Sequence, residues 1–263
     1  MVGVGTDGVV DLDALAAALD DDVRVVSVML ANNEVGVVQP LAEVAAVVRE
    51  RASRAALHTD AVQAFPWLDV AELAVDADLV AVSAHKFGGP KGVGALVVRD
   101  GVRLQPIIHG GGQEADRRSG TYNVAGIVGM AAAVQATVAE RKDTVDRVTR
   151  LRDRLAGAVL AAVPDAHETG DRANKVAGNC HLRFVGVESE ALLVLLDDAG
   201  VCASAGSACA SGALEPSHVL SAMGVPADEA RGALRLSLGA TTTEADVDRA
   251  ASVVAEAVAR LRA

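Results

Sequence analysis

Short valine-rich runs alternate with longer helical patterns in the first part of the chain. Runs at 24–30, 57–60, 78–84 and 94–99 predict strands, and the apolar spacing over 41–54 predicts a helix between the first two. Strands that alternate with helices are typical of α/β proteins with a mainly parallel sheet, and such sheets bind ligands beyond the carboxyl ends of their strands. We therefore expect the chemistry of this chain at strand ends.

A second pattern begins with a long predicted helix over 124–163, which Pro164 ends. Strand, helix and strand patterns follow in that order at 179–185, 188–199 and 233–238. A last helix is predicted from about Thr242, with Thr241-x-x-Glu244 as its capping box.

These two patterns predict two domains. We place the boundary near residue 145, inside the long helix, so that residues 1–145 form the first domain and residues 146–263 form a smaller α/β domain. The chain has 263 residues, which suffices to bury a sizeable core in one large or two modest domains. Its formal net charge of -11 argues against a nucleic-acid-binding surface.

The sequence also predicts the compartment. Residues 1–8 have no basic region followed by an apolar core, so we expect no secretory signal. The uncharged stretch at 119–139 contains Ser, Thr, Asn and Gln, which favours a helix buried in protein over a membrane span. Cys180, Cys202 and Cys209 are an odd number without metal-ligand spacing. They predict free thiols in a reducing, cytoplasmic compartment and no bound metal.

Two polar side chains stand at predicted strand ends. Lys86 follows the run at 78–84 and precedes a Gly/Pro cluster that forces a turn. A lysine there can be desolvated, which lowers its pKa and lets the neutral amine form a Schiff base; the alternative is an exposed loop lysine. Asp60 ends the run at 57–60, where residue type alone favours a helix N-cap or a turn residue over a site carboxylate.

Ordered motifs across nearly the whole chain resemble one family. They are Asn32-Asn33-Glu34-Val35-Gly36-Val37-Val38-Gln39, Asp60-x-x-Gln63, Ser83-x-His85-Lys86, Arg118-Ser119-Gly120-Thr121, the segment 205–220 around Cys209, and Arg235-Leu236-Ser237-Leu238-Gly239. Together they resemble the cysteine desulfurases, which use pyridoxal 5'-phosphate (PLP) and belong to the class V aminotransferase group. The resemblance implies an α/β fold of the PLP-dependent transferase type I, like aspartate aminotransferase. Residues 1–145 would be the C-terminal part of the large PLP-binding domain, and residues 146–263 the small domain with the cysteine loop.

The resemblance also implies roles for the strand-end residues. Lys86 would be the Schiff-base lysine that moves protons, and Asp60 would hold the pyridine nitrogen protonated. Gln63 would donate to the ring oxygen. Ser83 and His85 would bind the phosphate, with His85, next to Lys86, also among the catalytic residues. Thr121 would reach the phosphate in the neighbouring subunit, which implies a homodimer.

Two further residues are expected to bind the substrate. Arg235 lies on an apolar strand, where an unpaired guanidinium is costly, so a carboxylate partner is expected. Residue type alone allows an internal salt bridge. The resemblance favours the α-carboxylate of the substrate L-cysteine, with Asn33 near both substrate and cofactor.

Cys209 lies in a run of small residues, where a cysteine is either an inert buried side chain or an accessible nucleophile. The resemblance implies the nucleophile, which takes the substrate sulfur as a persulfide and releases L-alanine. Cys180 and Cys202, in apolar strand-like contexts, are interpreted as structural. The long form of the segment 205–220 resembles the branch that supplies iron–sulfur cluster assembly and tRNA thiolation, so the expected partner is an iron–sulfur scaffold or another sulfur-acceptor protein.

The chain departs from the family pattern in one respect. Before Asn32, the Thr-rich phosphate loop and the ring-stacking histidine of the family have no counterpart. We therefore expect the chain to be the C-terminal part of a desulfurase, either a fragment or one piece of a split enzyme. Two alternatives stay open. One is another class V transaminase or a selenocysteine lyase, although the Cys209 segment weighs against a plain transaminase. The other is an inactive remnant of the fold that binds a partner subunit.

Overall fold

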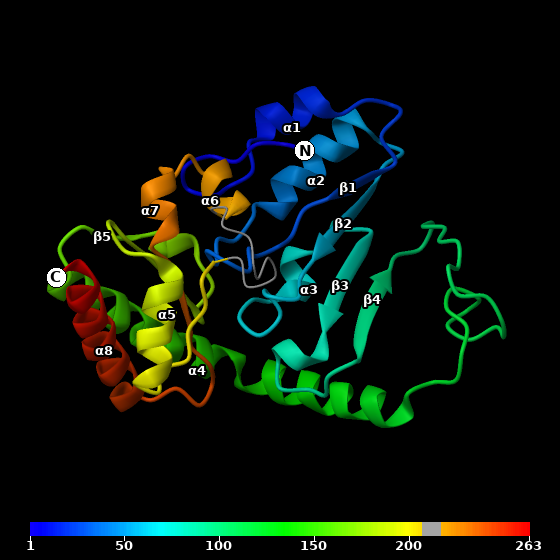
Figure 1. Ribbon diagram of the computed structural model, residues 1–263. Coiled ribbons are helices and arrows are strands. Elements are labelled where there is room, and N and C mark those ends of the chain that lie inside the picture. The colour runs from blue at the N-terminus through cyan, green and yellow to red at the C-terminus, as the bar shows by residue number, and fades with distance from the viewer. Residues whose placement is uncertain (207–216) are drawn as a thin grey trace. The chain divides into compact units, whose positions relative to one another are not determined.

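The computed structural model describes residues 1–206 and 217–263, which fold into two compact units (Figure 1). Unit 1 contains Met1–Ala18, Ala31–Pro40 and Lys142–Ala263, and unit 2 contains Leu19–Leu30 and Leu41–Arg141. Each unit has its own sheet.

Unit 2 is built on a four-stranded sheet with the order β1-β2-β3-β4. Its strands are β1 (Val25–Ser27), β2 (Ala56–Asp60), β3 (Leu79–Ser83) and β4 (Gly94–Val98). The first three strands are parallel, and β4 pairs antiparallel with β3. The mainly parallel α/β sheet predicted for this part of the chain is therefore confirmed.

Helices connect the parallel strands of unit 2. α2 (Leu41–Arg51) joins β1 to β2, and the short α3 (Val70–Leu73) joins β2 to β3. α2 buries Leu41, Val44, Ala45 and Val48, which recur at helical spacing and form one apolar face. Because parallel strands require such crossovers, β2 and β3 both end at the same edge of the sheet.

The longest element is α4 (Val124–Ala162), which agrees with the helix predicted over 124–163. Its N-terminal part packs in unit 2, where Met130 joins Ala84 and Phe87 in a buried cluster. Its C-terminal part contributes apolar residues to the core of unit 1: Val148, Leu151, Leu155 and Val159.

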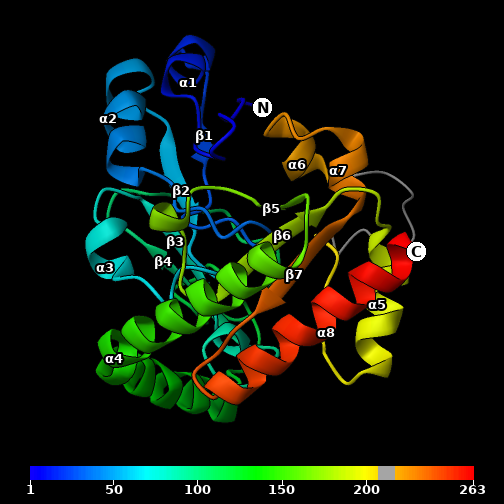
Figure 2. The same cartoon turned by 90° about the vertical axis from the view of Figure 1, so that its left-hand side faces the viewer.

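Unit 1 is built on an antiparallel sheet with the order β5-β6-β7. Its strands are β5 (Ala166–Glu168), β6 (Asn179–Phe184) and β7 (Ala233–Ser237). Two helices, α5 (Ser189–Asp198) and α8 (Glu244–Arg262), lie alongside each other next to this sheet (Figure 2). Unit 1 also contains the shorter elements α1 (Leu12–Ala18), η2 (Arg172–Asn174), α6 (His218–Ala222) and α7 (Ala227–Arg231).

The units divide the chain differently from the boundary predicted near residue 145. The change at Lys142 is close to that boundary, but residues 1–18 and 31–40 belong to unit 1. The physical reason is packing across long sequence distances. Val35 and Val37 join a buried cluster with Leu220 and Met223, and Val37 forms a bridge with Lys175.

The capping box predicted at Thr241-x-x-Glu244 is wrong. The N-cap of α8 is Thr243, whose side chain accepts a hydrogen bond from the Asp246 backbone. The Asp246 carboxylate accepts one from the Thr243 backbone in return. The sequence contains three consecutive threonines, and the pattern alone did not indicate which of them caps the helix.

Across residues 1–206 and 217–263, none of the helices combines the length and apolar character needed to cross a membrane.

Candidate active site

The predicted cofactor residues of unit 2 lie at the carboxyl ends of two neighbouring strands. Asp60 is the last residue of β2 and Ser83 the last of β3. Asp60 is paired in register with Ala81, and the Ala61 backbone donates to the Ala81 carbonyl at 2.9 Å. The parallel pairing therefore brings the Asp60 end of β2 next to the Ser83 end of β3.

The Asp60 carboxylate is fixed by the turn that follows it. Its Oδ1 accepts a hydrogen bond from the Val62 backbone at 2.8 Å. Asp60 therefore acts as a turn residue, which is one of the two roles that its residue type predicts. Gln63 lies half-buried in the same turn.

Lys86 ends a single 3-10 turn, η1 (Ala84–Lys86), directly after β3. Only Ala84 of this turn is buried, while His85 and Lys86 are exposed. The Ser83 hydroxyl lies 2.8 Å from His85 Nδ1, which ties the histidine ring to the strand end. Burial within this chain does not desolvate the Lys86 amine, because η1 turns only its first side chain toward the core.

Thr121 lies in unit 2, exposed between Gly120, whose φ is 114°, and the start of α4. No hydrogen bond links Thr121 to Asp60, Ser83 or Lys86 within the described residues. Its predicted role, at the cofactor of a neighbouring subunit, stays a prediction.

Arg235 and Asn33 come together in unit 1. Arg235 Nη1 donates to the Asn33 carbonyl at 2.9 Å, and Nη2 donates to Ser204 Oγ at 3.4 Å. Arg235 Nε is buried and has no hydrogen-bond partner within residues 1–206 and 217–263. The internal salt bridge allowed by residue type is not found there. The guanidinium therefore retains a buried donor that could bind a carboxylate.

The three cysteines differ in their surroundings. Cys209, the predicted nucleophile, lies outside the described residues. Cys180 is buried on β6, and burial raises the pKa of its thiol to about 12, so it is inert as predicted. Cys202 is exposed and outside any strand, so the strand context on which its structural interpretation rested is wrong. The apolar sequence around Cys202 predicted a strand, but the chain there forms only an isolated bridge at Ser204.

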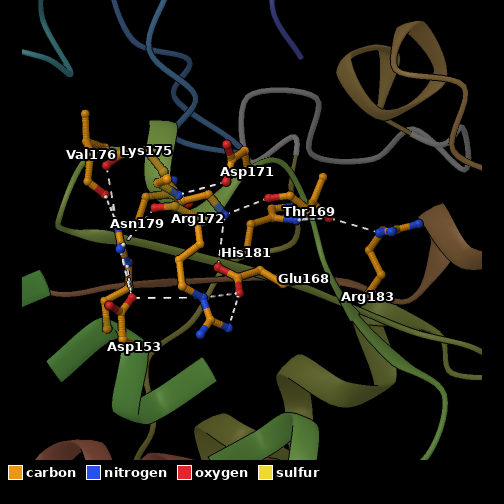
Figure 3. Close-up of polar contacts among 12 residues, drawn as sticks. Asp153, Glu168, Thr169, Asp171, Arg172, Lys175, Val176, Asn179, His181 and Arg183 are labelled. Atoms are coloured by element: carbon orange, nitrogen blue, oxygen red, sulfur yellow. Dashed lines mark hydrogen bonds and ion pairs between the residues drawn. The ribbon is translucent and has the colours of Figure 1, made fainter. Parts of the chain in front are cut away.

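A network of charged side chains in unit 1 was not predicted from the sequence (Figure 3). Glu168 pairs with Arg172 and with the fully buried amine of Lys175, whose Nζ also donates to the Thr169 carbonyl at 2.6 Å. Burial lowers the pKa of Lys175, while the Glu168 carboxylate opposes this shift. In the sequence Glu168 and Arg172 stand four residues apart, a spacing that by itself does not indicate a buried network.

The same network continues to His181 on β6 (Figure 3). His181 Nδ1 lies 2.9 Å from Thr169 Oγ1, and Arg183 Nε donates to the same oxygen at 3.0 Å. His181 is completely buried, and this burial lowers its pKa to about 3. The ring is therefore neutral near pH 7. The network supplies partners for the Lys175 amine and His181 Nδ1, while His181 Nε2 has none within residues 1–206 and 217–263.

Comparison with known proteins identifies a family that matches most of this chain and relatives that are similar to it. The family described as aminotransferase class-V matches residues 1–250. Cysteine desulfurase IscS of Methanosarcina thermophila is 45% identical over 255 residues, which are 97% of this chain and 62% of the relative. The IscS-like cysteine desulfurase of Mycobacterium tuberculosis is 51% identical over 259 residues, which are 97% of this chain and 65% of the relative.

Solved structures give the same picture. A NifS-like protein matches with a TM-score of 0.90 at 36% identity, over 98% of this chain and 67% of its own. SspA in complex with cysteine matches with a TM-score of 0.72 at 28% identity, over 92% of this chain and 66% of its own. The chain spans 62% and 65% of the length of the two curated relatives, which is less than two thirds.

Proposed function

This chain belongs to the class V aminotransferase family, and we propose that it works as part of a PLP-dependent cysteine desulfurase. The observation that carries the proposal is the position of Lys86 in the turn directly after β3, while Asp60 ends β2, the parallel neighbour of β3. An amine and a carboxylate at adjacent strand ends are the groups that PLP chemistry requires of a protein.

The proposed reaction converts L-cysteine and an enzyme thiol into L-alanine and an enzyme persulfide. The carbon–sulfur bond of the substrate breaks, and a sulfur–sulfur bond to Cys209 forms. The substrate β-carbon keeps the electron pair of the broken bond and takes up a proton, while the sulfur is oxidised to the persulfide level. The atoms and electrons balance without an external oxidant or reductant.

The strand-end groups of unit 2 fit PLP chemically. The exposed Lys86 amine could attach to its aldehyde carbon, and the Asp60 carboxylate could pair with its protonated ring nitrogen. The Ser83 and His85 side chains, already linked at 2.8 Å, could bind the phosphate, and the Gln63 amide could donate to the ring oxygen. When bound, PLP would supply an electron sink for bond breaking at the substrate.

The proposed substrate contacts come from unit 1. The buried, unpartnered Nε of Arg235 supports a role in binding the α-carboxylate of L-cysteine, since an unused guanidinium donor is costly to bury. Asn33 would act through its backbone carbonyl, which holds the Arg235 guanidinium in place at 2.9 Å. Lys86 would move protons at the substrate carbons, and Cys209 would receive the sulfur.

The wider setting of the enzyme is also a proposal. The form of the segment 205–220 supports transfer of the persulfide sulfur to a protein acceptor, in iron–sulfur cluster assembly or tRNA thiolation. The exposed position of Thr121 is compatible with a contact to a neighbouring subunit of a homodimer. Three cysteines without metal-ligand spacing support a reducing, cytoplasmic location.

Borohydride trapping tests the cofactor site. After incubation of the chain with PLP, borohydride reduction and peptide mapping should find the pyridoxyl group on Lys86. Replacing Lys86 by alanine should remove the label and the yellow absorbance of lysine-bound PLP, and leave the far-UV circular dichroism unchanged. Lys91 is the matched control, because it lies in the same Gly-rich turn and is also exposed.

Lys91→Ala should keep the label on Lys86. A pyridoxyl group on Lys91, or equal labelling of both lysines, would contradict the assignment. The sulfur-transfer step is tested separately, since Cys209→Ser should stop alanine formation from L-cysteine without changing PLP attachment.

A further inference from the structure

A buried amide lies on the same face of the unit 1 sheet as the arginine proposed to bind the substrate. In the antiparallel pairing of β6 with β7, His181 lies opposite Arg235. Asn179 stands two residues before His181 on β6 and therefore shares its face. Asn179 is thus a diagonal neighbour of Arg235, at a distance of about 7–8 Å that lets both side chains reach one piece of the chain.

That piece is a tight turn at 32–37. The Asn32 carbonyl accepts from the Gly36 amide at 3.0 Å, and the Asn32 amide donates to the Val37 carbonyl at 2.9 Å. Asn32 Oδ1 also accepts from the Glu34 amide at 2.8 Å. The turn therefore pairs its own amides, and the carbonyls in its middle are bound by residues outside it.

Two residues of the sheet bind consecutive carbonyls of this turn. Arg235 Nη1 donates to the Asn33 carbonyl at 2.9 Å, and Asn179 Nδ2 donates to the Glu34 carbonyl at 2.8 Å. Asn179 is only 6% exposed, so water cannot easily replace its bond. A shift of the Glu34 carbonyl would move the adjoining peptide group, so the bond from Asn179 fixes the carbonyl that holds Arg235.

The turn also packs directly on Asn179. Gly36 has a φ of 79°, and a Cβ atom there would lie 2.7 Å from Asn179 Cβ and 2.8 Å from its Cγ. The contact therefore requires glycine at this position. On its other side the turn is tied to the start of α6, because Ser217 Oγ donates to Glu34 Oε2 at 2.5 Å.

The cost of burying Asn179 supports a role beyond stability. Its Oδ1 is buried and has no hydrogen-bond partner within residues 1–206 and 217–263. A buried acceptor without a partner is costly, and this cost offsets the gain from the bond that Nδ2 makes. The side chain thus adds little net stability, while its one bond supports the carbonyl next to the one that Arg235 uses.

We propose that Asn179 is a positioning residue, which holds the 32–37 turn so that the Asn33 carbonyl keeps the Arg235 guanidinium in one orientation. The contacts concern described residues of unit 1 alone. Their effect on catalysis rests on the proposed function, in which Arg235 binds the α-carboxylate of L-cysteine. Asn179 would then control substrate affinity through Arg235.

The first measurement follows the Arg235 side chain in the 263-residue chain and needs no catalysis. Arg235 Nε is buried, so the exchange of its proton with solvent reports how firmly the guanidinium is held. NMR measures this exchange, and the signal is assigned from its loss in Arg235→Lys. Asn179→Ala should speed the exchange about fivefold, since a hydrogen bond no longer holds the turn. If circular dichroism shows that Asn179→Ala does not fold, Asn179→Leu replaces it, because leucine also branches at Cγ and fills a similar space beside Gly36.

Asn174→Ala is the matched control. Asn174 Nδ2 donates to the Val38 carbonyl at 3.0 Å, so this variant loses the same kind of bond just beyond the turn. It should leave the exchange of the Arg235 proton unchanged. Unchanged exchange in the Asn179 variant would overturn the proposal. An equal rise in Asn174→Ala would also overturn it, because the response would then be general loosening of this part of the chain.

Steady-state kinetics connect the positioning role to the proposed function. In protein that forms alanine from L-cysteine, Asn179→Ala should raise KM for L-cysteine about fivefold and leave kcat unchanged, because substrate binding alone is weakened. PLP attachment to Lys86 should stay as in the parent. A lower kcat with an unchanged KM would contradict a role through Arg235. A parent that forms no alanine would contradict the proposed function, while the exchange measurement still decides whether Asn179 holds Arg235.

Discussion

Two neighbouring residues on β6 show how burial controls titration in unit 1. Cys180 and His181 are adjacent and therefore point to opposite faces of the sheet, yet both are completely buried. Burial disfavours the charged form of each, which raises the pKa of Cys180 to about 12 and lowers that of His181 to about 3. Both faces of this strand are therefore covered, and neither side chain is available for acid–base chemistry near pH 7.

His181 makes the stability of unit 1 sensitive to acid. Its pKa is 6.5 in an ordinary environment and about 3 in the folded chain. Between these values the unfolded chain binds the extra proton, so the free energy of unfolding falls as the pH falls below 6.5. The expected loss from this residue is about 2 kcal/mol at pH 5. Urea unfolding of the parent and of His181→Gln at pH 7 and pH 5 measures this loss. Between these pH values, the free energy of unfolding should fall by about 2 kcal/mol more in the parent than in the variant.

His167→Gln is the control, because it removes an exposed histidine from the neighbouring strand β5 and leaves His181 in place. Parallel pH dependences of the parent and His181→Gln would contradict the role of burial at this site.

The N-terminus of helix α8 is stabilised by an N-cap residue that the sequence pattern does not identify. Thr243 and Asp246 exchange hydrogen bonds across the first turn, and these bonds lower the pKa of the Asp246 carboxyl. The carboxylate also lies at the helix N-terminus, where negative charge is stabilising.

Removal of this cap should destabilise the chain measurably. Thr243→Ala should lower the free energy of unfolding by about 1 kcal/mol, because the Asp246 amide loses its partner. Thr241→Ala should change it by less than about 0.5 kcal/mol, since Thr241 is not the cap. Thermal unfolding followed by circular dichroism compares the two variants, and a larger loss in Thr241→Ala would reverse the assignment.

The sequence predicted the long and periodic elements of both units well. α2, α4 and α8 have apolar faces several turns long, and β3 is apolar from Leu79 to Val82, so local pattern is sufficient for these elements. α3 and β5 were missed, because four and three residues carry too little periodicity.

The sequence predicted the strand-end positions of the candidate site but not the contacts between distant parts of the chain. Asp60 is recognisable because it ends the predicted strand at 57–60, and Lys86 because it stands just after the predicted strand at 78–84. The pair of Glu34 and Ser217 is separated by 183 residues, so no local pattern connects them. The same long-range packing assigns residues 31–40 to unit 1, against the boundary that the sequence predicted.

Apolar side chains remain uncovered in the part of unit 2 that precedes and begins α4. Ile107 is 93% exposed, and Val124, Ile127 and Val128 are 64%, 44% and 62% exposed. The last three stand at positions i, i+3 and i+4, so they share one face of the first turns of α4. Thr121, which the family resemblance assigns to a neighbouring subunit, comes just before this face. Uncovered apolar faces of this kind favour association, so they support the proposed homodimer.

The last prediction concerns self-association of the whole chain. Replacing Ile127 or Val128 by glutamate puts a charge into the face that would be buried, and each lost apolar contact is worth about 1.5–3 kcal/mol. Either variant should therefore raise the dimer dissociation constant more than tenfold in sedimentation equilibrium. Val194→Glu is the matched control, because Val194 is 68% exposed on α5, and it should associate like the parent. Because the chain carries a net charge of -11, added salt should strengthen association of the parent by screening repulsion. A parent that stays monomeric at high salt, or equal weakening by Val194→Glu, would show that this face of α4 is not the contact.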